Sequence, residues 1–204
     1  MARRALPEDD VFAALAKGDR RPLLVLRECM RCNGTDNALL QAQADNERTL
    51  LMTRWFHCVK LPPDVLSEDH PFHALFAGEK PAHLFLARWD GSERQDLTGQ
   101  QSRTELWELM EERLAREYVS GPQAALKGLL PLCDELDQLD VDIDDAKQRL
   151  DKAQVEDGPE SAKASKWKKR LAGLQDERNQ ALARIEELSR IGLKPAPAEA
   201  PTKS

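Results

Sequence analysis

The sequence has few aromatic residues and no long apolar run. Aromatic residues make up 5 % of the 204 residues, whereas charged residues make up 32 %. No segment approaches the ~18 consecutive apolar residues that a membrane-spanning helix needs. The first residues include two arginines, but no apolar stretch of signal-peptide length precedes Pro7. These absences predict a soluble, cytoplasmic protein without a membrane partner.

The charge balance and the motifs that are missing narrow the function further. The formal net charge is −6, so the chain as a whole has no attraction for nucleic acid, and we do not expect nucleic acid as a partner. No glycine-rich phosphate loop, Ser-His-Asp arrangement or paired-carboxylate site stands out. We therefore expect no nucleotide cofactor, and no other cofactor is indicated.

Cysteine is scarce, and two of the cysteines form a CxxC pair. The cysteines are Cys29, Cys32, Cys58 and Cys133. So few cysteines in a cytoplasmic protein do not fit a framework of structural disulfides. The pair Cys29 and Cys32 therefore indicates redox or metal chemistry.

The CxxC pair lies between an expected strand and an expected helix. An apolar run predicts a buried strand over residues 22–26, and the residues after the pair predict a helix over about 35–45. A helix N-terminus carries roughly half a unit of positive charge, which stabilises a thiolate. Arg27 and Arg31 favour the thiolate in the same way, whereas Glu28 opposes it.

The remaining pattern up to Tyr118 alternates between helices and strands. Asp90-Gly91-Ser92 is a turn signal that predicts a hairpin between two of the strands. The expected elements are a helix over 7–17, strands over 22–26, 49–61, 81–89 and 95–99, and helices over about 35–45 and 102–118.

This order resembles the thioredoxin-like superfamily over residues 7–118. The resemblance is carried by the CxxC after the first strand and by the segment GEKPAHLFLARWDGSERQDLTG, in which a proline opens the strand before a hairpin. It implies an α/β thioredoxin-like fold in which Cys29 is the attacking thiol and Cys32 the resolving thiol. It also implies that Pro81, preceded by Lys80, is cis, packs against the dithiol and contacts the substrate.

Three other interpretations of the pair stay open. Zinc needs four ligands, and Cys29, Cys32, Cys58 and His57 form one possible set if the second strand ends at the same sheet edge. Alternation along a strand sends His57 and Cys58 to opposite faces, which argues against that metal site. Cys58 could instead be a third thiol that exchanges with the pair. Finally, the fold could be a non-enzymatic scaffold with inert cysteines.

Two apolar series with alternating steps of three and four follow Tyr118. The first series holds Leu129, Leu132, Leu136, Leu139, Ile143, Ala146, Leu150 and Ala153, and the second holds Ala164, Trp167, Leu171, Leu174, Ala181, Ile185 and Leu188 with Arg178 as a polar member. Because Asp157–Glu160 separates them, they predict an antiparallel coiled-coil hairpin whose arms reach roughly 40 Å. The expected division is a thioredoxin-like domain over 1–118, this helical hairpin over 119–191 and a disordered tail over 192–204.

The predicted hairpin has an uneven charge distribution. Residues 147–170, around the turn, hold eight basic and four acidic residues, whereas the part before them is rich in aspartate. Such an arm is suited to binding a protein partner or to forming a homodimer. The sequence thus predicts a thiol–disulfide oxidoreductase that acts on a protein held by the arm. A non-enzymatic thioredoxin-fold interaction protein, with or without a metal at the CxxC, is the alternative.

Overall fold

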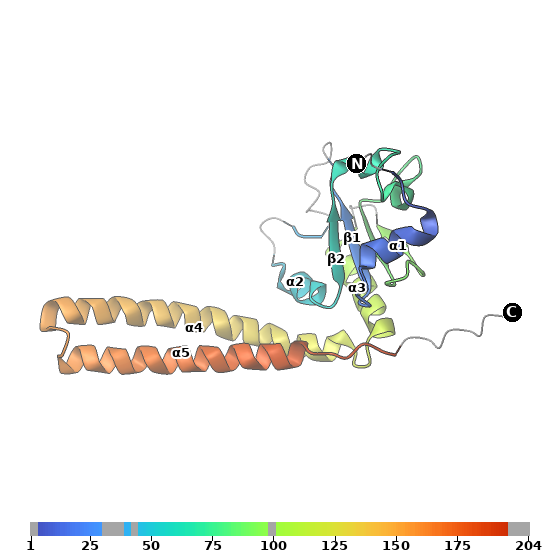
Figure 1. Cartoon of the computed structure of the whole chain (residues 1–204). Coiled ribbons are helices and arrows are strands. Elements are labelled where there is room, and N and C mark those ends of the chain that lie inside the picture. Colours follow the sequence, from blue (N-terminus) through green and yellow to red (C-terminus); the bar gives the residue numbers. More distant parts are fainter. Residues whose placement is uncertain (1–3, 30–38, 42–44, 98–100, 196–204) are drawn as a thin grey trace. The chain divides into compact units, whose positions relative to one another are not determined.

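The computed structural model describes residues 4–29, 39–41, 45–97 and 101–195 (Figure 1). The chain divides into two compact units, residues 1–123 with 191–204 and residues 124–190. The first unit contains a mixed β-sheet with helices, and the second consists of two long helices (Figure 1). The chain is therefore of the α/β class, as the sequence predicts.

A mixed sheet of four strands is the centre of the first unit. The strands are β1 (Leu23–Arg27), β2 (His57–Leu61), β3 (Leu84–Ala87) and β4 (Gln95–Leu97), in the spatial order β2-β1-β3-β4. β1 is parallel to β2 and antiparallel to β3, and β4 is antiparallel to β3. Every residue of β1 is buried, as expected for a central strand whose two faces are both covered.

Helices and short 3₁₀ turns surround this sheet. They are α1 (Glu8–Ala16), α2 (Glu47–Thr53), η2 (Pro63–Leu66), η3 (His73–Phe76) and α3 (Arg103–Glu117). α3 begins at Ser102, whose hydroxyl accepts a hydrogen bond from the Glu105 amide at 3.1 Å and so satisfies one unpaired helix donor. α1 and α3 confirm the helices expected over 7–17 and 102–118.

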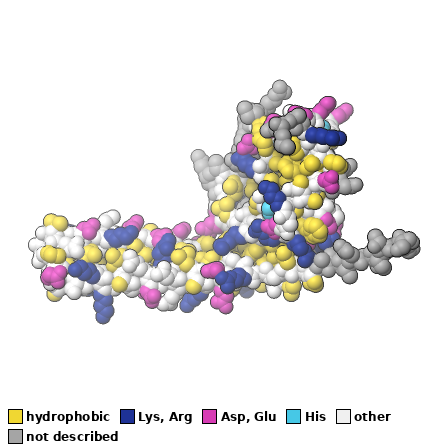
Figure 2. All heavy atoms as spheres, viewed as in Figure 1, with side chains coloured by type: hydrophobic (Ala, Val, Ile, Leu, Met, Phe, Trp, Pro, Cys, Tyr) yellow, Lys and Arg dark blue, Asp and Glu magenta, His cyan; other side chains and the backbone are white. Residues whose placement is uncertain are grey.

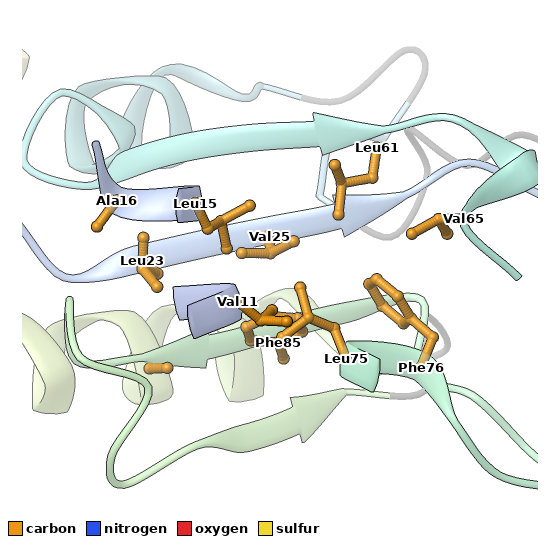
Figure 3. Packing of buried hydrophobic residues seen from close by; sticks show 11 residues of the cluster. Val11, Leu15, Ala16, Leu23, Val25, Leu61, Val65, Leu75, Phe76 and Phe85 are labelled. Carbon is orange, nitrogen blue, oxygen red and sulfur yellow. The ribbon is translucent and has the colours of Figure 1, made fainter. Parts of the chain in front are cut away.

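One face of the sheet packs on α1 and η3. Val11 and Leu15 of α1 meet Val25 of β1 and Phe85 of β3, and Figure 3 shows these side chains pointing toward one another. Phe76 closes the same cluster, with its ring centroid 5.9 Å from that of Phe85. Burying each such side chain contributes about 1.5–3 kcal/mol, so this layer fixes the sheet against α1.

The structure corrects the strand expected over 49–61. Its first part is α2, and the strand β2 starts only at His57. Thr49 and Met52 are both buried, and their spacing of three residues places them on one helix face. The same residues suit a strand by composition alone, and packing of this face decides for the helix.

The second unit is an antiparallel helical hairpin. α4 (Pro122–Asp157) contains Pro131, and α5 (Ala162–Ser189) follows a turn in which Gly158 has φ +91°. Leu139 and Ile143 of α4 pack in one cluster with Leu174 of α5. Midway along the two helices Arg178 pairs with Asp140 at 2.6 Å, and nearer the turn the Arg149 guanidinium lies 5.1 Å from the centre of the Trp167 ring. Supercoiling of the two helices stays a prediction.

The tail expected to be disordered begins with bonded residues. The Val119 amide donates to the Gly192 carbonyl, and the Lys194 amide donates to the Glu117 carbonyl, both at 2.8 Å. These bonds place 192–194 beside 117–119, and the rest of that prediction, from residue 196 onward, lies outside the described residues. Among the helices that are described, none is long and apolar enough to cross a membrane.

Candidate functional site

Cys29 lies two residues beyond the end of β1 and is half-buried. Among the described residues, Cys58 and Cys133 are not part of a disulfide. Cys32, together with residues 30–38, lies outside the described residues, so the spacing of the two sulfurs is untested. The parallel pairing of β1 with β2 places Cys29 at the carboxyl-terminal edge of both strands.

Only part of the helix expected over about 35–45 falls within the described residues. Residues 39–41 and Asp45 are described, and none of them is helical. The Gln41 amide donates to Asn46 Oδ1 at 3.0 Å, and Asn46 Nδ2 donates to the Gln41 carbonyl at 2.9 Å. An asparagine side chain that bonds the backbone in this way competes with helical bonds.

The register of β1 against β3 brings Pro81 to the same edge as Cys29. Leu26 pairs with Leu84, and beyond them the Arg27 amide donates to the His83 carbonyl at 2.8 Å. The Arg27 side chain also donates to the Pro81 carbonyl at 3.2 Å, so the Pro81 segment lies beside the end of β1, two residues before Cys29. The structure thus brings together two segments that the sequence separates by about fifty residues.

The Arg27 side chain joins these two segments. Arg27 is only 5 % exposed. Its guanidinium donates to the carbonyls of Ala82 at 3.1 Å, Pro81 at 3.2 Å and Glu28 at 3.4 Å. Burial lowers the pKa of Arg27 from its ordinary value, although a guanidinium stays charged in proteins. A buried positive charge therefore lies against the Glu28 carbonyl, one residue before Cys29. The sequence suggested the charge effect of Arg27 but not its burial or its carbonyl partners.

His83 is a site residue that the sequence did not single out. Its Nδ1 lies 3.4 Å from Arg27 Nη2, so the ring nitrogen accepts from the guanidinium. Burial, and then the charge of Arg27, lower the pKa of His83 below its usual value. Both effects favour the neutral imidazole, whose Nδ1 lone pair already accepts from Arg27. Its position two residues after Pro81 is the one signal in the sequence that could have indicated it.

The expectation of a cis bond before Pro81 is wrong. The described residues contain no cis peptide bond, so the Lys80–Pro81 bond is trans. The trans form is the more stable one for X–Pro bonds unless the surroundings force the other. Here the Pro81 and Ala82 carbonyls face the Arg27 donors as the chain runs toward β3. Lys80 is exposed at this edge.

The structure separates His57 and Cys58 from this edge. His57 pairs with Leu23 at the first position of β1, so both residues lie at the sheet edge opposite Cys29. The length of β1 alone separates the edges by about 13 Å at ~3.3 Å per residue. The proposed metal set of Cys29, Cys32, Cys58 and His57 and the relay through Cys58 are therefore wrong. Both hypotheses assumed that the second strand ends near His57 and Cys58, whereas β2 begins at His57.

His57 and Cys58 have structural partners at their own edge. His57 Nδ1 lies 3.0 Å from Asp19 Oδ2, and Nε2 lies 3.2 Å from the Leu15 carbonyl. The Cys58 thiol donates to the Thr53 carbonyl at 3.4 Å, and desolvation raises its pKa. Nowhere in the described part of the chain do three or more His, Cys, Asp or Glu residues form a group that could hold a metal ion.

The edge near Cys29 combines a half-buried cysteine with charged and polar side chains. Comparisons with protein-family models, with curated proteins and with solved structures found no match. The geometry itself supplies a cysteine, a buried guanidinium and a neutral imidazole at one sheet edge. A neighbouring cation lowers the pKa of a thiol and so raises the fraction of reactive thiolate.

Proposed function

We propose that this protein carries out thiol–disulfide exchange on a protein substrate, within a thioredoxin-like fold. The observation that carries the proposal is the position of Cys29, just beyond the buried strand β1 and one residue after Glu28, whose carbonyl accepts from the Arg27 guanidinium. The parallel β1–β2 pair followed by the β3–β4 hairpin supports the thioredoxin-like part of the proposal.

The proposed reaction moves two electrons to the substrate. The Cys29 thiolate attacks one sulfur of a substrate disulfide, which forms a mixed disulfide and releases one substrate thiolate. The Cys32 thiolate then attacks the Cys29 sulfur and releases the second substrate thiolate, leaving a Cys29–Cys32 disulfide. Each released thiolate takes up a proton, and a dithiol reductant restores the pair. In this proposal the positive charge of Arg27 favours the thiolate form of Cys29.

A disulfide-reduction assay tests this function. Insulin is the disulfide substrate and dithiothreitol the reductant, and we expect turnover above the uncatalysed background. Cys29→Ser should abolish the turnover, because the attacking thiol is lost. Cys58→Ser is the matched control and should retain turnover, because Cys58 lies at the opposite edge of the sheet. Equal turnover by the wild type and Cys29→Ser would contradict the proposal.

A second candidate is a non-enzymatic interaction protein in which the sheet unit is a scaffold. The observation that favours it is the long helical hairpin, whose outer faces carry many exposed charged side chains. In that case neither the wild type nor Cys29→Ser would exceed background in the reduction assay. In both candidates the hairpin binds a protein partner.

A further inference from the structure

The helical hairpin carries opposite charge at its two ends. We call residues 147–170 the tip segment, and residues 130–146 with 171–190 the base segment. The tip segment holds eight basic and four acidic residues, a net charge of +4. The base segment holds eleven acidic and three basic residues, a net charge of −8. The hairpin is therefore an electric dipole along its length.

Pairing within the hairpin neutralises these ends only in part, although Lys147, Arg149 and Arg170 of the tip segment pair with aspartates of the base segment. Lys163 of the tip segment pairs with Asp157 at 3.0 Å, and Arg178 of the base segment pairs with Asp140 at 2.6 Å. In the described part of the hairpin, no ion pair involves Lys166 or Lys169 of the tip segment. The same holds for Asp134, Glu135 and Asp137 of the base segment, which are all exposed. Figure 2 shows charged side chains of both signs on the surface of the hairpin.

We propose that two copies of this chain associate through their hairpins in antiparallel orientation, with the tip segment of each copy against the base segment of the other. A two-fold axis makes both contacts at once, because any contact from tip to base is repeated from base to tip. A parallel arrangement would instead place like charges together, which costs free energy. The partner is thus a second copy of this chain.

The lengths of the two segments fit this arrangement. The acidic run of the base segment, residues 134–145, spans about 18 Å at 1.5 Å per residue. Each helical arm of the tip segment, residues 147–157 and 162–170, spans about 14–17 Å on the same basis. The basic surface can therefore cover the acidic run without extending beyond it.

The outer faces of the helices make this contact, because the inner faces are already used. Leu139, Ile143 and Leu174 are buried between the two helices of one hairpin. On the base segment, Val141 is 64 % exposed and Leu182 is 39 % exposed, which is too little apolar surface to drive association alone. Charge must then supply most of the attraction, so the dimer should weaken as salt screens it.

Sedimentation velocity of the full chain, in the presence of reductant, measures the association. Between about 20 mM and about 500 mM salt the Debye length falls from roughly 20 Å to roughly 4 Å. We expect a dimer at low salt whose dissociation constant rises at least about tenfold at high salt. A monomer at low salt and high micromolar concentration would overturn the proposal, and so would a dimer that is indifferent to salt.

Charge reversal at the two segments gives a sharper test. The double variant Lys166→Glu with Lys169→Glu lowers the net charge of the tip segment from +4 to 0, and Asp134→Lys with Asp137→Lys changes that of the base segment from −8 to −4. Each variant should dimerise more weakly than the wild type at low salt, because the attraction between tip and base falls. The loss should be larger for the tip variant, whose tip segment is then neutral. A dissociation constant equal to that of the wild type in either variant would overturn the proposal.

A matched control keeps the change in net charge separate from its position. Glu68→Lys with Asp69→Lys changes the charge as the base variant does, but at exposed residues of the sheet unit. This control should dimerise like the wild type. Far-UV circular dichroism should show the same helix content in all variants, because Lys and Glu are both good helix formers. None of these measurements depends on the thiol chemistry, so the association and the proposed function can fail separately.

Discussion

The buried guanidinium of Arg27 donates a hydrogen bond to the carbonyl of Pro81, with 3.2 Å between Nη2 and the oxygen. It holds together the end of β1 and the segment that enters β3, and Cys29 follows Arg27 by two residues. The same side chain therefore sets the shape and the charge of the proposed thiol site.

Replacing Arg27 tests its effect on the thiol. Arg27→Met removes the positive charge, so we expect the pKa of the Cys29 thiol in the reduced protein to rise toward ~8.5, that of a free cysteine. The pH dependence of alkylation, followed by mass spectrometry of the Cys29 peptide, measures this pKa. Arg54→Met removes an exposed charge at the opposite sheet edge and is the control. A Cys29 pKa near that of free cysteine in the wild type would contradict the catalytic role.

The lowered pKa of the Asp19 carboxyl should make the stability of the fold depend on pH. Hydrogen bonds from the Arg21 side chain, and then from the Arg21 amide and His57, lower its pKa to about 2. A folded-state pKa below the unfolded value of ~3.9 stabilises the fold above pH ~4, and this contribution is lost as the pH falls toward 2. Asp19→Asn should therefore destabilise the protein at pH 7 by about 1–2 kcal/mol.

Urea unfolding at several pH values checks this prediction. The difference between wild type and Asp19→Asn should shrink from pH ~4 downward, because the wild-type carboxyl then takes up a proton. A difference that stays constant down to pH ~2 would mean that the charge of Asp19 is not what stabilises the fold.

The buried guanidinium of Arg113 should stabilise the fold, so its removal should lower the free energy of unfolding. Its residue is 1 % exposed, and its Nη1 lies 3.2 Å from Glu93 Oε2 and 3.8 Å from Glu117 Oε1. Arg113→Met leaves Glu117 with one cation fewer in a buried setting, so we expect a loss of about 2–3 kcal/mol. Arg116 pairs with the same Glu93 but is half exposed, so Arg116→Met should cost less than about 1 kcal/mol. Equal costs in urea unfolding would contradict this account.

Burial of Leu174 between α4 and α5 should stabilise the hairpin. Leu174 is 1 % exposed, so Leu174→Ala should destabilise the hairpin by about 2–4 kcal/mol through the cavity it leaves. Leu182, on the same helix, is 39 % exposed, and Leu182→Ala should cost less than about 1 kcal/mol. Hydrogen exchange of the hairpin amides separates this effect from the sheet unit, and equal protection in both variants would contradict it.

Local patterns predicted some parts of the fold better than others. The apolar run of β1 and the spacing of three and four residues in the second unit identified a buried strand and two long helices. The prediction failed over 49–61, where the same residues suit a strand by composition and a helix by spacing. That error shifted the start of β2, and it alone had suggested that His57 and Cys58 could join Cys29.

The sequence by itself determined that two long helices follow a mixed α and β region and that a CxxC follows a buried strand. These features depend on residues within a few positions of one another, so the order of side chains is enough to establish them. Only the tertiary structure decided which residues meet at the carboxyl-terminal edge of β1. Arg27 bonds the Pro81 carbonyl from 54 residues away, and that contact depends on the register of β1 against β3, which no local pattern encodes.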